Sequence, residues 1–196
     1  MRPFAPEDVL RGQFRGDRSE PGVKPDSEVE TFSALKLAID SWRWRGVPFY
    51  IRSGKNLPVT CTEIVVRLRE APTMCRQSDL KRNHFRFRVS PEIVAAFGMN
   101  AVAPNSEPES QLVEMTFHRQ LGEEDMDAYE RVLTDAMDGD ATLFARQDYV
   151  EEEWRIVDPV LQAGTPVFEY EPHTWGPKEV ERVTPPGGWQ DPVVSR

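Results

Sequence analysis

The sequence of 196 residues predicts an α+β fold, in which a large, mostly antiparallel sheet has helices packed on one face. Two patterns support this class. Between residues 29 and 117, apolar segments of strand length are separated by loops rather than by helices, which favours antiparallel pairing. After residue 126, two longer segments repeat their apolar residues every three or four positions, as amphipathic helices do.

The first half of the chain is expected to supply the strands. Residues 1 to about 27 are rich in Pro, Gly, Asp and Arg and are expected to form an irregular lead-in, with one helical turn at 6–10. Strands are expected at about 29–39, 49–52, 63–69, 85–89 and 112–117. In 29–39 the apolar residues mix periods, and a helix is the alternative there. In 85–89 the Phe and Val side chains share one face and the Arg side chains share the other, so one face of the sheet is polar.

The second half is expected to supply the helices. The first helix covers about 127–137 and ends at Gly139, while the second covers about 148–161 and is loosened near its end by Pro159. The side chains expected to be buried in the second helix are Tyr149, Trp154, Ile156, Val157, Val160 and Leu161. From about residue 164 a loosely packed Pro/Gly-rich tail is expected, with one short helix near 177–182. Residues 28–196 are therefore expected to form a single domain.

Composition excludes several classes of protein. The formal net charge of −9 repels nucleic acid and anionic lipid at long range, so neither is expected as a partner. The sequence has no apolar run of about 18 residues and no signal peptide at its start, which predicts a cytoplasmic protein that does not cross a membrane. Two cysteines, Cys61 and Cys75, are too few for a disulfide framework or a four-cysteine zinc site, and no metal is expected.

One segment, residues 46–58, combines residue types that suit phosphate. An apolar strand delivers Arg52 and Lys55 to a turn in which Gly54 allows close approach of the backbone. A lysine offers a compact charge with three donors, and an arginine can bind a second pair of oxygens. The alternative is a solvated hairpin with surface cations, and the spacing does not match the phosphate-binding loop of nucleotide hydrolases.

The same segment closely resembles the corresponding part of glucose-6-phosphate dehydrogenases. The similar residues follow one another in the order expected of that family, at 11–14, 30–32, 42–55, 83–85 with 88, 127–133, 138–139, 153–155 and 175–177. The resemblance implies the C-terminal domain of such an enzyme. It also implies that Lys55 contacts the phosphate of glucose 6-phosphate, with weaker contributions from Arg52 and from Thr60, where the family commonly has a second cation.

The resemblance also implies what this chain does not supply. No Gly-x-Gly-x-x-Gly turn is present, so NADP is expected to be bound by an N-terminal Rossmann domain and no cofactor by this chain. The three histidines, His84, His118 and His173, are expected to be structural or solvated, so no catalytic residue is expected here. The family's large sheet mediates subunit pairing, which implies a homo-oligomer, either a dimer or a tetramer. A non-catalytic assembly module that dimerises through its sheet is the alternative function.

Overall fold

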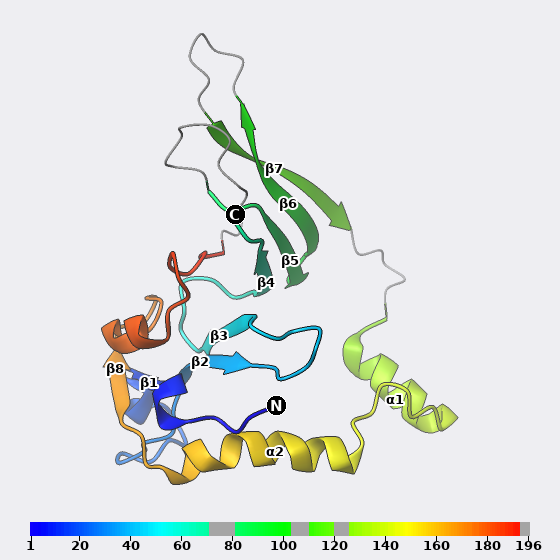
Figure 1. Ribbon diagram of the computed structural model, residues 1–196. Coiled ribbons are helices and arrows are strands. Elements are labelled where there is room, and N and C mark those ends of the chain that lie inside the picture. The colour runs from blue at the N-terminus through cyan, green and yellow to red at the C-terminus, as the bar shows by residue number, and fades with distance from the viewer. Residues whose placement is uncertain (71–80, 103–109, 120–125, 193–196) are drawn as a thin grey trace. The chain divides into compact units, whose positions relative to one another are not determined.

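The computed structural model describes residues 1–70, 81–102, 110–119 and 126–192 (Figure 1). Cys75 lies outside these ranges. The chain divides into two compact units, the first formed by residues 1–59 and 132–189 and the second by residues 60–131 and 190–196. Each unit contains one four-stranded sheet, so the α+β class with mostly antiparallel pairing is confirmed. The strands are divided between two sheets rather than joined in the single sheet expected.

The sheet of the first unit has the strand order β3-β2-β1-β8. Its strands are β1 (Val9–Phe14), β2 (Phe32–Ala38), β3 (Pro48–Gly54) and β8 (Val167–Tyr170). β2 pairs antiparallel with both β1 and β3, whereas β8 pairs parallel with β1. Parallel strands need a long connection, and here all strands of the other sheet and both α-helices lie between β1 and β8 in sequence. The end of the chain therefore returns to the strand at its beginning.

The core of the first unit lies on this sheet. Its buried side chains are Leu10, Phe14, Phe32, Ala34, Tyr170 and Val183. They come from three of the strands and from η3 (Lys178–Val183), a short 3-10 helix that confirms the helix expected near 177–182. Both ends of the chain thus contribute to one core. Burying several large apolar side chains is the main favourable contribution to the stability of such a unit.

Two expectations about the ends of the chain are wrong. The lead-in at 1–27 has its helical turn as η1 (Pro6–Asp8), but it is not irregular, because strand β1 follows and lies inside the sheet. A second 3-10 turn, η2 (Asp17–Ser19), follows. The tail after 164 is not loosely packed, because it contains β8 and two members of the core, Tyr170 and Val183. These segments gain their order from pairing with distant strands, which a local pattern does not show.

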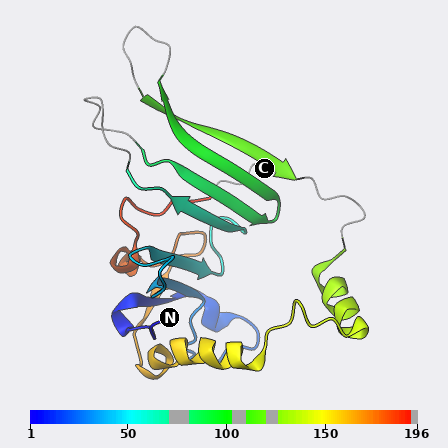
Figure 2. The ribbon, with the colours of Figure 1, turned by 45° about the vertical axis from the view of Figure 1, so that its right-hand side comes forward.

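The sheet of the second unit is a simple antiparallel meander, with the strand order β4-β5-β6-β7 (Figure 2). Its strands are β4 (Thr62–Arg67), β5 (His84–Ser90), β6 (Ile93–Val102) and β7 (Ser110–Arg119). The strands expected at 63–69, 85–89 and 112–117 are confirmed, as are those at 29–39 and 49–52 in the first unit. β6 was not expected, because its small residues Ala95, Ala96 and Gly98 weaken the strand pattern.

Both expected helices are present, as α1 (Ala128–Asp138) and α2 (Gln147–Gln162). Gly139 follows α1 with a φ of 72°, the left-handed conformation typical of a helix end. The expected buried set of α2 is wrong. Only Val160 is buried, while Trp154 is 56% exposed. The backbone of α2 is tied instead to the start of the chain, where the Phe4 amide donates to the carbonyl oxygen of Ile156 at 2.9 Å.

None of the helices that the structure describes is long and apolar enough to cross a membrane. Within the described ranges, no three side chains of His, Cys, Asp or Glu gather in a way that would hold a metal ion.

Candidate functional site

The backbone of Lys55 is held on both sides of the turn that follows β3. The Lys55 amide donates to the carbonyl oxygen of Thr31 at 2.8 Å, and the hydroxyl of Tyr170 donates to the carbonyl oxygen of Lys55 at 2.7 Å. The next residue, Asn56, has a φ of 50° and turns the chain away from the strand. The Lys55 side chain itself is exposed. The fold therefore presents a cation to solvent from a fixed backbone.

Gly54 is required by close packing at this turn. A Cβ atom at Gly54 would lie 2.8 Å from Cδ2 of Phe32, its partner in the β2–β3 register. Phe32 is only 1% exposed, so its ring has no room to withdraw. The sequence predicts that Gly54 permits the turn. The structure shows why glycine is required there: the β3 backbone passes close to a buried ring.

The guanidinium of Arg52 lies close to two indole rings. Its central carbon is 4.4 Å from the ring centroid of Trp175 and 4.8 Å from that of Trp189. Both distances suit cation–π attraction, which is stronger where water is partly excluded. The sequence predicts that Arg52 assists Lys55 in binding phosphate, and that role remains a prediction. In the structure, Arg52 on β3 contacts two tryptophans from the last part of the chain.

Thr60 is exposed and is the first residue of the second unit, whereas Lys55 belongs to the first. A shared phosphate site of Lys55 and Thr60 therefore stays a prediction.

Of the three histidines, His118 and His173 are exposed. His84 is 4% exposed and belongs to a polar network on the second sheet.

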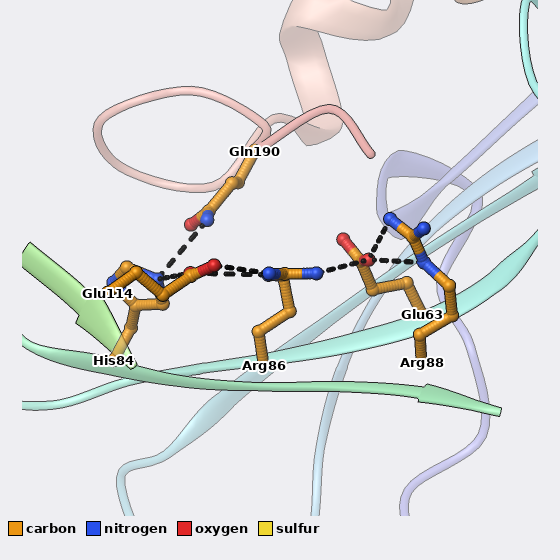
Figure 3. A network of polar contacts seen from close by, with 6 residues as sticks. All are labelled: Glu63, His84, Arg86, Arg88, Glu114 and Gln190. Carbon is orange, nitrogen blue, oxygen red and sulfur yellow. Dashed lines mark hydrogen bonds and ion pairs between the residues drawn. The ribbon is translucent and has the colours of Figure 1, made fainter. Parts of the chain in front are cut away.

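That network contains two carboxylates, each shared between cationic or imidazole partners (Figure 3). Glu63 accepts from Arg88 at 2.8 Å and 3.0 Å and from Arg86 at 3.4 Å. Glu114 accepts from Arg86, and its Oε2 lies 3.1 Å from Nε2 of His84. The side chains come from β4, β5 and β7 and share one face of the sheet, because the register pairs Glu63 with Arg88.

Charge pairing inside the network shifts its titration. The hydrogen bond from Arg86 holds the pKa of Glu114 below its ordinary value, and the same bond raises the pKa of Arg86. The alternation of residues in β5 predicts its polar face but does not reveal this network. Its signal is the alternation of His84, Arg86 and Arg88 opposite two glutamates, which only strand register brings together.

The lowered pKa of Glu114 predicts an acid-dependent stability. Because the folded-state pKa lies below the unfolded one, the contribution is complete at neutral pH and is lost as pH falls through the folded-state value. Replacing Glu114 by Gln is expected to lower the free energy of unfolding by about 1–2 kcal/mol at neutral pH, since the group is partly exposed. In urea denaturation this difference should shrink as the pH falls and the carboxylate becomes protonated.

A matched control for this measurement is Glu92→Gln, which changes an exposed glutamate in the loop after β5. Glu92→Gln should leave the free energy of unfolding at neutral pH within about 0.5 kcal/mol of wild type. A difference between wild type and Glu114→Gln that stays constant from neutral to acid pH would contradict the assigned role of the carboxylate.

The family is decided by comparison with known proteins. Residues 1–190 match the family model described as "Glucose-6-phosphate dehydrogenase, C-terminal domain". The chain belongs to this family. The resemblance noted in the sequence is thereby confirmed over nearly the whole chain.

The chain matches only part of the length of its relatives. The chain is 36% identical over 200 residues to glucose-6-phosphate 1-dehydrogenase 1 of Mycobacterium tuberculosis (strain CDC 1551 / Oshkosh), covering 100% of the chain and 42% of that protein. It is 36% identical over 213 residues to glucose-6-phosphate 1-dehydrogenase of Aggregatibacter actinomycetemcomitans, covering 98% of the chain and 43% of that protein. This family member therefore spans less than half the length of these relatives.

Solved structures agree with this assignment. The structure of glucose-6-phosphate 1-dehydrogenase from Mycobacterium avium superposes with a TM-score of 0.88 at 35% identity, over 99% of this chain and 42% of that one. A glucose-6-phosphate dehydrogenase in complex with its substrate glucose 6-phosphate superposes with a TM-score of 0.79 at 26% identity, over 97% and 43% respectively.

Proposed function

We propose that this chain is the C-terminal substrate-binding and oligomerisation domain of a cytoplasmic, NADP-dependent glucose-6-phosphate dehydrogenase. Such an enzyme oxidises glucose 6-phosphate to 6-phosphogluconolactone at the start of the oxidative pentose phosphate pathway. The observation that carries the proposal is the exposed ammonium of Lys55 on a turn whose amide and carbonyl are both bonded. A related enzyme of the same fold was solved with glucose 6-phosphate bound.

The role of Lys55 is to attract and position the sugar phosphate. A phosphate dianion attracts a nearby ammonium strongly even in a chain of net charge −9. Salt largely screens charges that lie farther from the phosphate than the Debye length of about 8–10 Å, so the nearest cation dominates. Arg52 and Thr60 are proposed as weaker contributors. Within this proposal NADP, the hydride acceptor, is bound by an N-terminal Rossmann domain, which also supplies the base. No catalytic residue, metal or cofactor is assigned to this chain.

Replacing Lys55 by Ala tests the proposal in enzyme assembled from this chain and its N-terminal Rossmann domain. We expect the KM for glucose 6-phosphate to rise about 10- to 100-fold, since a charge-assisted hydrogen bond contributes about 1.5–3 kcal/mol. The KM for NADP should stay within about twofold, because only the sugar phosphate loses a partner. Steady-state rates of NADP reduction measure both constants.

The matched control is Lys36→Ala, which removes an exposed lysine from the neighbouring strand β2. It should change neither constant. The chain by itself should give no turnover, and clear activity of the chain alone would contradict the need for a second domain. Equal increases of both KM values in Lys55→Ala would contradict the role of Lys55.

The assembly role rests on a separate observation, the exposed apolar face of the second sheet. We define this apolar face by the outward side chains Ile64, Val66, Phe85, Phe87, Val89, Val113, Met115 and Phe117. The register places them together, since Phe87 pairs with Ala95, which pairs with Phe117. An apolar face of this extent requires cover in water. We propose that a second copy of the chain covers it, in a homodimer.

Light scattering after size-exclusion chromatography tests the assembly role. At tens of micromolar the chain should elute as a species of twice the mass of 22.5 kDa. A strictly monomeric chain at this concentration would contradict the proposed assembly role while leaving the role of Lys55 intact.

A further inference from the structure

The hydroxyl of Tyr170 lies at the end of a short relay of hydrogen bonds inside the first unit. The Phe14 amide donates to Oγ1 of Thr31 at 3.0 Å, and this Oγ1 lies 3.3 Å from the Tyr170 hydroxyl. The Tyr170 hydroxyl has two carbonyl acceptors in reach, that of Lys55 at 2.7 Å and that of Thr31 at 3.3 Å. Because its single proton follows the shorter bond to Lys55, we assign Thr31 as the donor in the bond between the two hydroxyls. The relay therefore orients the tyrosine proton toward the Lys55 turn.

The ring of Tyr170 is fixed by packing. It makes an edge contact with Phe14 at 6.5 Å between centroids and a tilted contact with Phe32 at 5.5 Å. Tyr170 is only 4% exposed, and burial raises the pKa of its hydroxyl above the ordinary value, so the group remains a donor throughout the neutral range. Its position is thus set by the core and not by the turn that it contacts.

The neighbouring residues hold the same turn from two further directions. The carbonyl oxygen of Thr31 accepts the Lys55 amide, and the His173 amide donates to the carbonyl oxygen of Asn56 at 2.6 Å. Residues of β8 and the segment after it therefore fasten a turn that is 115 positions away from Tyr170 in sequence. A cation on such a turn keeps its position before ligand arrives, which reduces the entropy lost on binding.

We propose that Tyr170 is a positioning residue for substrate phosphate, acting through its hydrogen bond to the Lys55 backbone. The inference rests on the proposed function of Lys55 and adds a second residue to it. Tyr170 does not touch the ligand. It fixes the origin of the Lys55 side chain, so that the ammonium samples a smaller volume around the phosphate.

The decisive variant is Tyr170→Phe, which removes the hydroxyl and leaves the ring. In enzyme assembled with the N-terminal Rossmann domain, the KM for glucose 6-phosphate should rise about three- to tenfold. This factor corresponds to the net free energy of one lost hydrogen bond. The kcat and the KM for NADP should change less than about twofold. Tyr50→Phe, which makes the same chemical change on β3, is the matched control and should leave all three constants unchanged.

A double-mutant cycle separates positioning from general loosening of the fold. When Lys55 is already Ala, Tyr170→Phe should raise the KM no further, because no ammonium remains to be positioned. A further increase of the same size in that background would overturn the inference. If Lys55→Ala alone leaves the KM unchanged, the proposed function and the inference both fail. If Lys55→Ala raises the KM and Tyr170→Phe does not, only the inference fails.

A second pair of variants keeps the inference testable if Tyr170→Phe does not fold. Thr31→Val removes the hydroxyl that orients Tyr170, and it should raise the KM for glucose 6-phosphate about twofold or more. Thr31→Ser keeps a hydroxyl and should restore the wild-type KM. Equal KM values for Thr31→Val and Thr31→Ser would overturn the inference that the Thr31 hydroxyl orients Tyr170.

Discussion

Replacing Phe117 by Asp is expected to weaken self-association of the chain at least about 100-fold. The Phe117 side chain is 67% exposed in the single chain and lies on the apolar face of β7. Its removal forfeits about 1.5–3 kcal/mol of apolar burial, and an unpaired carboxylate in the interface adds a desolvation cost of several kcal/mol. In a two-fold symmetric dimer the substitution occurs twice, which enlarges the effect.

The matched control is Thr116→Asp, the preceding residue on the same strand. Successive side chains of a strand point to opposite faces, so this substitution adds the same charge on the polar face of the sheet. Analytical ultracentrifugation over a range of concentrations should show wild type and Thr116→Asp as dimers and Phe117→Asp as a monomer. Equal dissociation constants for the two variants would refute self-association through the apolar face.

Replacing Gly176 by Ala is expected to destabilise the first unit by about 3 kcal/mol. Two costs add together. The φ of Gly176 is 104°, where a side chain costs about 1–2 kcal/mol, and a Cβ atom there would lie 2.5 Å from Cζ of Phe32. Since Phe32 belongs to the core, its ring gives way only by overpacking its neighbours, at about 1–3 kcal/mol.

Gly16 offers a control that isolates the second cost. Its φ is 106°, nearly that of Gly176, but no atom lies within 4 Å of the position of an added Cβ. Gly16→Ala should therefore lose only the backbone contribution of about 1–2 kcal/mol in urea denaturation. If both variants lose the same stability, the contact between Gly176 and Phe32 does not limit the substitution.

Much of the second unit could be predicted from local pattern. The alternation of Phe85, Phe87 and Val89 with arginines marks both a strand and its two faces, because side chains in a strand alternate with period two. Helix α1 was equally clear, since its apolar residues recur at helical spacing and Gly139 stops it. The pattern overestimated burial in α2, because amphipathic spacing shows which side is apolar but not whether anything covers it.

The candidate site was only half predictable. The residues from Arg52 to Lys55 identified the turn, and resemblance to the family gave Lys55 its expected ligand. Tyr170 was missed, since it lies in a Pro- and Gly-rich segment that was expected to pack loosely. A signal was available in the run Val167, Phe168 and Tyr170, which is rich in strand-forming residues.

The sequence by itself determined the α+β class, most of the strands and both α-helices, the family and the lysine that is proposed to bind phosphate. These depend on periodicity and on short runs of neighbouring residues, which are local properties of the chain. Only the tertiary structure decided that β1 and β8 pair, that Arg52 contacts two indoles, and that Tyr170 holds the Lys55 turn. The physical reason is that these contacts join residues more than 100 positions apart, and their energy appears only once the sheet has brought both ends together.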